Sequence, residues 1–295
     1  METPTVAVVT RTRDRSLFLS RALESVRHQT FSDWHHVVVN DGGPPGAVDE
    51  LVQRGDPAHV AKSQVVHLPA SVGRGRAANT GLRACGSTLV VFHDDDDAWR
   101  PTFLERAVAE LRRTGRPGVV FASERVIERL EGGRLVEVSR EPWRPEVTSV
   151  SLAECARDNC FTNLAFLAER SAIEAVGGYD ETLDVYEDWD LNLRFLSRYD
   201  IAFFPEMLVA YHARLEASGS ARGSFDGRAV DAANARAALV NRWLRNQATA
   251  PIGLLMALGP TLDAIAMVRT RLDKAFNVLH RLRQGWRFPL GGRSP

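Results

Sequence analysis

Four consecutive aspartates, Asp94 to Asp97, follow an apolar segment (TLVVFHD, residues 88–94) with the composition of a buried strand. Because side chains alternate along a strand, Asp94 and Asp96 are predicted to project to one face. Their oxygens suit Mg²⁺ or Mn²⁺, ions that also bind substrate phosphates. A solvated acidic turn is the alternative, but four like charges after a buried strand cost stability unless a cation compensates. The sequence therefore predicts a divalent metal here.

A second carboxylate, Asp41, ends another apolar segment (HVVVND, residues 36–41) and precedes Gly42-Gly43. The glycines let the backbone pass close to a ligand, and the carboxylate could accept hydrogen bonds from uracil or ribose. Asp-Gly-Gly is also an ordinary turn sequence.

A third acidic group, Glu187-Asp188-Trp189-Asp190, opens a segment in which Leu191, Leu193, Phe195 and Leu196 are spaced for packing. The helix N-terminus lowers the pKa of Asp188, whereas neighbouring carboxylates and burial raise it. A raised pKa suits a general base that deprotonates an acceptor hydroxyl. Simple N-terminal capping is the structural alternative.

Short apolar strands alternate with helix-like segments through the first hundred residues, which predicts a doubly wound, mostly parallel α/β sheet. Ligands of such sheets bind at the carboxyl ends of the strands. A helix is also predicted from Pro101 to Gly115, and a capping box, Ser171 with Glu174, precedes Gly177-Gly178. The predicted strands span residues 6–10, 36–41, 64–68 and 88–94, and the first helices span 16–28, 46–54 and 74–84.

Length and composition limit the alternatives. The chain has 295 residues with 37 basic and 37 acidic side chains, so no global field recruits nucleic acid. Its cysteines, Cys85, Cys155 and Cys160, lack metal-ligand spacing, and no signal peptide precedes the first apolar segment, which favours a reducing cytosol. The most apolar stretch, Pro251 to Val268, is interrupted by Pro260 and Asp263, so no membrane-spanning helix is expected.

Taken in order, the motifs resemble glycosyltransferase family 2 over about residues 5 to 215. The resemblance implies a GT-A fold, and departures from the usual motifs lie at Thr10-Arg11-Thr12-Arg13 and Asn40-Asp41-Gly42-Gly43. The motifs that carry it are Thr10 closing the first strand, Leu19-x-x-Ala22-Leu23-x-Ser25, Gln29-Thr30, VVVNDGG, HDDDDAWRP, VGGYDE and YEDWDLNLRF.

The resemblance assigns a role to each candidate residue. Asp188 would be the base of an inverting single displacement in which a metal offsets charge on the departing diphosphate. The donor would be held by Thr10, Arg13, Asp41, Arg74, Arg76, Asn79, Asp94 and Asp95. The metal would be held by Asp94 and Asp96, with Asp97 and His212 assisting. Acceptor contacts would come from Asn163 and Glu187, with Asn159 and Thr162 nearby.

The organisation predicted is a catalytic region of residues 1–220, with a donor half to about residue 100, and a helical extension of residues 221–295. Basic residues in the tail alternate with apolar ones, which favours contact of residues 251–295 with an anionic membrane surface; a homodimer contact is the alternative. The expected acceptor is a glycan, a lipid-linked molecule or a small molecule. The basic residues are Arg269, Arg271, Lys274, Arg281, Arg283, Arg287 and Arg293.

Three rival functions remain open. A dinucleotide-dependent oxidoreductase could use Gly73-x-Gly75-x-x-Ala78, although this motif follows a later strand and not the first. A sugar nucleotidylyltransferase should carry a Gly-rich loop after the first strand, where this chain has TRTRDR. A non-catalytic sugar-nucleotide-binding protein would keep the fold without turnover.

Overall fold

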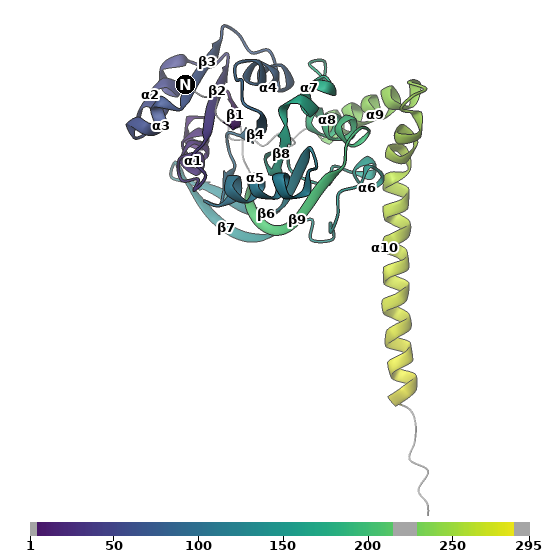
Figure 1. Ribbon diagram of the computed structural model, residues 1–295. Coiled ribbons are helices and arrows are strands. Elements are labelled where there is room, and N and C mark those ends of the chain that lie inside the picture. Colours follow the sequence, from purple (N-terminus) through teal and green to yellow (C-terminus); the bar gives the residue numbers. More distant parts are fainter. Residues whose placement is uncertain (1–4, 215–228, 286–295) are drawn as a thin grey trace, which may run out of the picture.

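The computed structural model describes residues 5–214 and 229–285, with side chains described for residues 5–214 and 231–274. Its centre is a sheet with the strand order β3-β2-β1-β4-β8-β6-β9-β5, in which β7 pairs with β6 (Figure 1). Strands β1 to β4 are parallel to one another. These four strands are β1 (Val6–Thr12), β2 (Trp34–Asp41), β3 (Ser63–Leu68) and β4 (Leu89–Asp94).

The first half of the chain forms the predicted alternation. Its predicted strands and helices are confirmed within a few residues, and β1 runs two residues beyond the expected end, to Thr12. A short helix, α3 (Pro57–Ala61), was not predicted; Asp56 caps it by accepting from His59 N. The connecting helices are α1 (Ser16–Arg27), α2 (Pro45–Gln53) and α4 (Arg74–Arg83).

The second half folds back onto the edge of β4. Strand β8 (Phe166–Glu169) pairs antiparallel with β4 and β6, and β6 (Gly118–Glu131) pairs in parallel with β9 (Ile201–Arg214). The remaining elements are β5 (Ala98–Trp99), α5 (Phe103–Thr114), β7 (Arg134–Trp143), α6 (Leu152–Arg157), the 3₁₀ turn η1 (Asn163–Ala165), α7 (Arg170–Ala175) and α8 (Glu187–Leu196).

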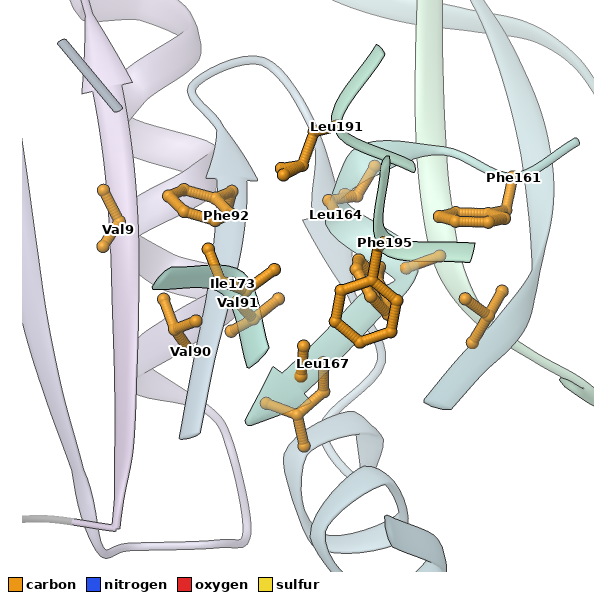
Figure 2. Close-up of a cluster of buried hydrophobic side chains, with 14 of the residues drawn as sticks. Val9, Val90, Val91, Phe92, Phe161, Leu164, Leu167, Ile173, Leu191 and Phe195 are labelled. Carbon is orange, nitrogen blue, oxygen red and sulfur yellow. The ribbon is translucent and has the colours of Figure 1, made fainter. Parts of the chain in front are cut away.

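A single apolar core joins the two halves. Figure 2 shows Val9 of β1 and Phe92 of β4 on one side, with Leu191 and Phe195 of α8 on the other. All four side chains are buried. Burying these side chains removes apolar area from water, which stabilises the fold by about 25 cal/mol for each Å². The core thereby fixes the start of α8 relative to the end of β4.

Two helix ends differ from the sequence prediction. The predicted capping box at Ser171 is wrong, because α7 already begins at Arg170 and has no side-chain cap. A capping serine instead starts α6, where Ser151 Oγ accepts from Glu154 N at 3.2 Å. The predicted ends at Gly177-Gly178 and at Gly115 are confirmed, since these glycines have positive φ values.

The C-terminal part consists of α9 (Ala229–Arg245) and α10 (Ala250–Gly285), which projects from the body as one long rod (Figure 1). The expectation that Pro260 and Asp263 interrupt this stretch is wrong. The helix continues through Pro260, and Asp263 forms an ion pair with Arg157. Residues 250–274 are long and apolar enough to cross a membrane by length and composition, with only 17% of the window buried. The predicted boundary near residue 220 lies outside the described residues.

The cysteines also differ from the expectation. Cys155 and Cys160 form a disulfide that closes the end of α6, whereas Cys85 is free and buried. The spacing analysis did not predict this pair.

Candidate active site

The four aspartates lie at the carboxyl edge of the sheet, but they do not all continue the strand. Strand β4 ends at Asp94, and the chain then turns. The strand alternation predicted for Asp94 and Asp96 therefore does not apply to Asp96. Each carboxylate faces a different set of partners, and most of these partners are arginines.

Asp95 and Asp96 share one guanidinium group. Arg15 Nη1 lies 2.7 Å from Asp95 Oδ1, and its Nη2 lies 2.6 Å from Asp96 Oδ2. Arg214, at the end of β9, also donates to Asp96 Oδ2. Burial raises the pKa of Asp95 to about 7 despite Arg15. Burial acts in the same direction on Asp96, but Arg15 and Arg214 outweigh it and hold the pKa of Asp96 at about 2.

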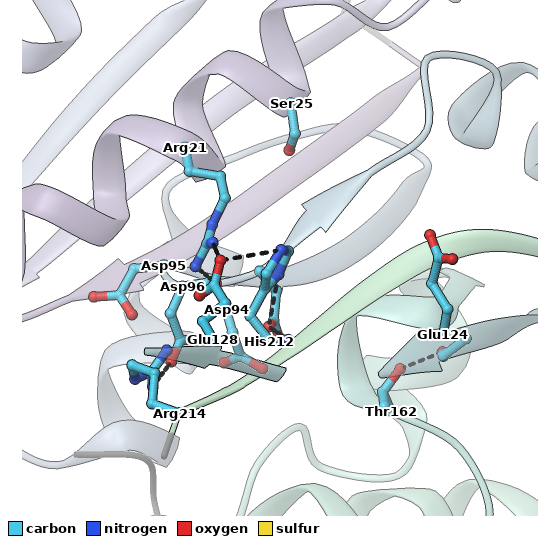
Figure 3. Close-up of polar contacts among 12 residues, drawn as sticks. Arg21, Ser25, Asp94, Asp95, Asp96, Glu124, Glu128, Thr162, His212 and Arg214 are labelled. Carbon is cyan, nitrogen blue, oxygen red and sulfur yellow. Dashed lines mark hydrogen bonds and ion pairs between the residues drawn. The ribbon is translucent and has the colours of Figure 1, made fainter. Parts of the chain in front are cut away.

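The carboxylate of Asp97 contacts the backbone N–H of His212 and lies near its ring. Asp97 Oδ1 accepts from His212 N at 2.7 Å, and the imidazole Nδ1 lies 3.8 Å from the same oxygen. Burial raises the pKa of Asp97, and burial followed by Arg21 lowers the pKa of His212 to about 3. Figure 3 shows Arg21 and Arg214 reaching the aspartates from α1 and β9.

Arg11 connects the aspartate run to the second acidic motif. Its Nη2 lies 3.0 Å from Asp94 Oδ1 and 3.3 Å from Glu187 Oε1. Arg74, at the start of α4, lies 3.1 Å from the same glutamate oxygen. Glu187 is 1% exposed, so its charge is compensated by these two arginines. The structure thus brings Asp94 and the start of α8 together, although 93 residues separate them.

Asp188 follows Glu187 in the first turn of α8. Its Oδ1 accepts from Trp189 N at 2.7 Å, and its Oδ2 accepts from Asn159 Nδ2 at 3.0 Å. Burial and then the neighbouring Glu187 raise the pKa of Asp188 to about 6, although Arg74 opposes them. A carboxylate in this range can take a proton near neutral pH.

Asp41 holds the loop that precedes α4. Its carboxylate accepts from Ser71 Oγ at 2.8 Å, from Val72 N at 2.7 Å and from Gly73 N at 3.3 Å. Arg13 donates to Ser71 Oγ from the other side, at 3.0 Å. Two of the residues predicted to hold the donor, Asp41 and Arg13, therefore meet around one loop, at the ends of β1 and β2.

Several predicted contacts face the interior. Thr10 is fully buried in the middle of β1, and its hydroxyl lies 2.9 Å from His36 Nε2. The prediction placed Thr10 at the strand end, whereas Thr12 occupies that position and donates to Asp95 Oδ2 at 2.7 Å. Asn79 is likewise buried; its Nδ2 donates to Tyr179 O and its Oδ1 accepts from Tyr179 N, each at 2.9 Å.

The remaining predicted side chains have structural partners. Arg76 is half-exposed and pairs with Glu181 at 2.9 Å. Asn163 is buried and accepts from the Tyr179 hydroxyl at 2.6 Å. Thr162 Oγ1 lies 2.9 Å from Ser123 Oγ. These contacts attach α4, η1 and β6 to the core.

The sequence analysis missed the arginines that face the aspartates. Arg11 appeared only as a departure from a motif, and Arg15 and Arg214 were not named. For Arg11 and Arg15, the signal in the sequence is the excess of basic residues in TRTRDR, residues 10–15, at the end of β1. Arg214 follows the expected histidine, His212, by two residues, and so lies on the same face of β9.

The donor set suits a divalent ion by its chemistry. Asp94 and Asp96 offer carboxylate oxygens that are partly exposed, 25% and 15% respectively. The described residues contain no group of three or more acidic, histidine or cysteine side chains arranged around one point. Mg²⁺ commonly takes one or two carboxylates and completes its shell with substrate phosphates and water, so two carboxylates suffice.

Comparisons with known proteins give the family. The profile described as Glycosyl transferase family 2 matches residues 5–168, more than half of the chain. The chain belongs to this glycosyltransferase family. The chain is 27% identical over 207 residues to an amylovoran biosynthesis glycosyltransferase of Erwinia amylovora, covering 70% of this chain and 74% of the relative. It is 30% identical to a pre-mycofactocin glycosyltransferase of Mycobacterium tuberculosis, over 72% of this chain but only 43% of that protein.

Solved structures share the fold. Staphylococcus aureus TarS (residues 1–349, with UDP-GlcNAc) superposes with a TM-score of 0.65 at 15% identity, covering 86% of this chain and 70% of that one. A mannosyltransferase from Pyrobaculum calidifontis, solved with GDP-Man and Mn²⁺, gives a TM-score of 0.61 at 17% identity, covering 97% and 82%. The expected GT-A fold is confirmed. Family membership also disfavours the oxidoreductase and nucleotidylyltransferase alternatives.

Proposed function

We propose that this glycosyltransferase moves a sugar from a nucleoside diphosphate donor to an acceptor hydroxyl, with inversion at the anomeric carbon. The observation that carries the proposal is the position of Arg11 between Asp94 and Glu187, at 3.0 and 3.3 Å. One guanidinium group thereby joins the aspartate run to the acidic pair that contains Asp188. The nucleotide sugars bound to the solved neighbours support the same class of donor.

Asp188 is the general base of the proposed reaction. It takes the proton of the acceptor hydroxyl, and the oxygen attacks the anomeric carbon from the face opposite the diphosphate. The bond from that carbon to the diphosphate oxygen breaks, and its electron pair leaves with the diphosphate. A single displacement inverts the configuration. The pKa of about 6 leaves Asp188 ionised at neutral pH but still able to accept a proton.

Charged side chains around the base position the donor. Asp41 and Arg13, which both bond Ser71, would contact the nucleoside, and Arg74 pairs with Glu187. Asp94 and Asp96 would hold Mg²⁺ or Mn²⁺, which supplies charge neutralisation to the diphosphate when bound. Arginine suits phosphate geometrically, so Arg15 and Arg214 can also turn toward the diphosphate.

The proposed setting is glycan, cell-envelope or natural-product glycoside synthesis on the cytoplasmic side of a membrane. Relatives named for amylovoran, O-antigen and succinoglycan biosynthesis support it. We divide the chain into a catalytic region to about residue 220 and a helical extension that contacts the membrane. The exposed apolar side chains of α10 support this role: Leu254, Leu258, Leu262, Ile265, Val268 and Leu272.

Calorimetric titration of UDP, GDP and dTDP, each with and without Mn²⁺, tests the proposal on the full chain and on Asp96→Ala. Metal-dependent binding of one nucleotide, weakened at least tenfold in the variant, is expected. Binding that ignores both the metal and Asp96 would remove the metal assignment. Donor binding with no hydrolysis or transfer would instead indicate a non-catalytic binding protein.

A further inference from the structure

The carboxylate proposed as the base is held from outside its own helix. Asp188 Oδ2 accepts from the side-chain amide of Asn159 at 3.0 Å. Asn159 follows α6, on the segment between the disulfide cysteines Cys155 and Cys160. The other carboxylate oxygen accepts from Trp189 N at 2.7 Å, in the first turn of α8. Two donors from two segments therefore fix the plane of the carboxylate.

The amide of Asn159 is itself oriented by a second asparagine. Asn192 Nδ2 donates to Asn159 Oδ1 at 3.0 Å, and Asn192 is fully buried. Asp188 and Asn192 are four residues apart on α8, so they lie on one face of the helix. With its oxygen engaged by Asn192, Asn159 can present only its NH₂ group to Asp188. The reverse orientation would place two oxygens in contact and leave both acceptors without a proton.

The backbone of the same segment is tied down on both sides. Trp189 Nε1 donates to Cys155 O at 2.6 Å, which joins the segment to α8. Arg144 donates to Asn159 O and lies 3.0 Å from Asp158. The position of Asn159 is thus set by contacts that do not involve its side chain, and the side chain remains available to orient Asp188.

We infer that Asn159 is a positioning residue for Asp188, with Asn192 behind it, and that the pair fixes the orientation of the base toward the acceptor hydroxyl. An amide NH₂ donates a stronger hydrogen bond to the ionised carboxylate than to the neutral acid, so it favours the form that accepts a proton. The inference rests on the proposed function for its catalytic meaning. The hydrogen bonds from Asn192 to Asn159 and from Asn159 to Asp188 do not depend on which sugar donor or acceptor molecule the enzyme uses.

Other groups around Asp188 also act on its proton affinity and stay constant in the comparison of variants. They come from β1, α4, β4, the segment before α8 and α8 itself. These groups are Arg11, Arg74, Asp94, Tyr179, Tyr186 and Glu187.

A direct test measures the pKa of Asp188 by ¹³C NMR on the full chain labelled at aspartate, with Asp188→Asn used to assign the signal. Loss of the Asn159 donor in Asn159→Ala is expected to raise this pKa by about one unit. Asn159→Asp removes the donor and adds a like charge, so a larger rise is expected. Asn159→Gln keeps a donor and should restore part of the wild-type value.

Trp189→Phe is the matched control. It removes the other tie between the segment and α8, at Cys155 O, without changing any charge. A merely structural role predicts similar pKa changes from Trp189→Phe and Asn159→Ala, and that result would overturn the inference. If Asn159→Ala fails to fold, Asn192→Leu removes the orienting donor while keeping the number and branching of the side-chain heavy atoms, and a pKa rise of the same sign is expected.

Kinetics separate this inference from the function on which it rests. UDP release is measured from UDP-glucose, UDP-GlcNAc and GDP-mannose (GDP in the last case), and the sugar nucleotide that turns over is used for all variants. Asn159→Ala should lower kcat about tenfold or more while the donor KM stays within about threefold of the wild-type value. The fall in kcat on the acidic side of the pH profile should shift to higher pH. Unchanged turnover in Asp188→Asn would refute the base assignment. Loss of turnover in Asp188→Asn with an unaltered Asn159→Ala would refute the positioning role alone.

Discussion

Arg15 Nη2 lies 2.6 Å from Asp96 Oδ2, the oxygen that also accepts from Arg214. Two guanidinium groups therefore neutralise the carboxylate that is proposed to hold a metal. A cation that binds Asp96 through Oδ2 must displace at least one of these donors, because all three compete for the lone pairs of that one oxygen. Metal binding at this site is expected to be coupled to movement of an arginine.

The first prediction concerns this competition. Arg214→Ala removes one competitor and should tighten Mn²⁺ binding to the nucleotide-free protein by about tenfold, roughly 1.4 kcal/mol. Electron paramagnetic resonance of free Mn²⁺ measures the effect without turnover. Arg100→Ala, which breaks a pair with Glu124 elsewhere on the sheet, serves as the control. Equal or weaker Mn²⁺ binding in Arg214→Ala would contradict the competition.

The second prediction is the pH dependence of transfer. Burial and Glu187 raise the pKa of Asp188 to about 6, and a base is active only when ionised. Activity should therefore fall about tenfold per pH unit below pH 6 and level off above it. Asp188→Asn should lower kcat by about 10² to 10⁴ with little change in donor binding. A kcat profile that stays flat down to pH 4.5 would show that another group accepts the proton.

The sequence predicted those elements whose signals are local. The strands that end at Asp41 and Asp94 contain continuous runs of β-branched residues. Asp188 lies in a group of acidic residues at the start of an amphipathic helix. The sheet then places these ends at one edge, because parallel strands share their direction. Alternation along the chain was sufficient for the parallel half of the sheet, and the GT-A fold followed from the family resemblance.

The partners inside the site required the tertiary structure. Asp96 and Arg214 are 118 residues apart, and no local pattern relates them. The end of β1 was misplaced because Arg11 and Thr12 can continue a strand as well as leave one. Both residues pair with β2, and Arg11 also pairs with Asp94 of β4, which keeps them in the sheet. In α10, Asp263 is tolerated because Arg157 of α6 compensates its charge.

The third prediction tests how closely α4 packs on the sheet. A Cβ at Gly81 would lie 2.3 Å from Val9 Cγ1 and 3.1 Å from Val39 Cγ2, side chains held in the core. Gly81→Ala should destabilise the fold by about 1–3 kcal/mol, because the steric cost exceeds the stabilisation from the higher helix propensity of alanine. Thermal unfolding should shift downward by several degrees. Gly46→Ala in α2 has open space around the added carbon and should be neutral or slightly stabilising. A stabilised Gly81→Ala would mean that α4 is free to move outward.

The fourth prediction concerns the exposed apolar face of α10. Leu258, Leu262 and Ile265 are 40–59% exposed and, at spacings of three and four, share one face of the helix. Asp263 lies on the other side, paired with Arg157. Ile265→Glu should therefore reduce co-flotation with vesicles of phosphatidylglycerol and phosphatidylcholine by about tenfold or more, since it places a charge on the face that meets lipid.

Thr270→Glu adds the same charge on a different side of α10, where the threonine hydroxyl bonds Ala266 O, and should retain more binding. Equal losses in the two variants would indicate that net charge alone controls binding. Light scattering on the same samples distinguishes the remaining possibility. A dimer that Ile265→Glu converts to monomer, with no flotation in the wild type, would assign the apolar face to a second copy of the chain instead of a membrane.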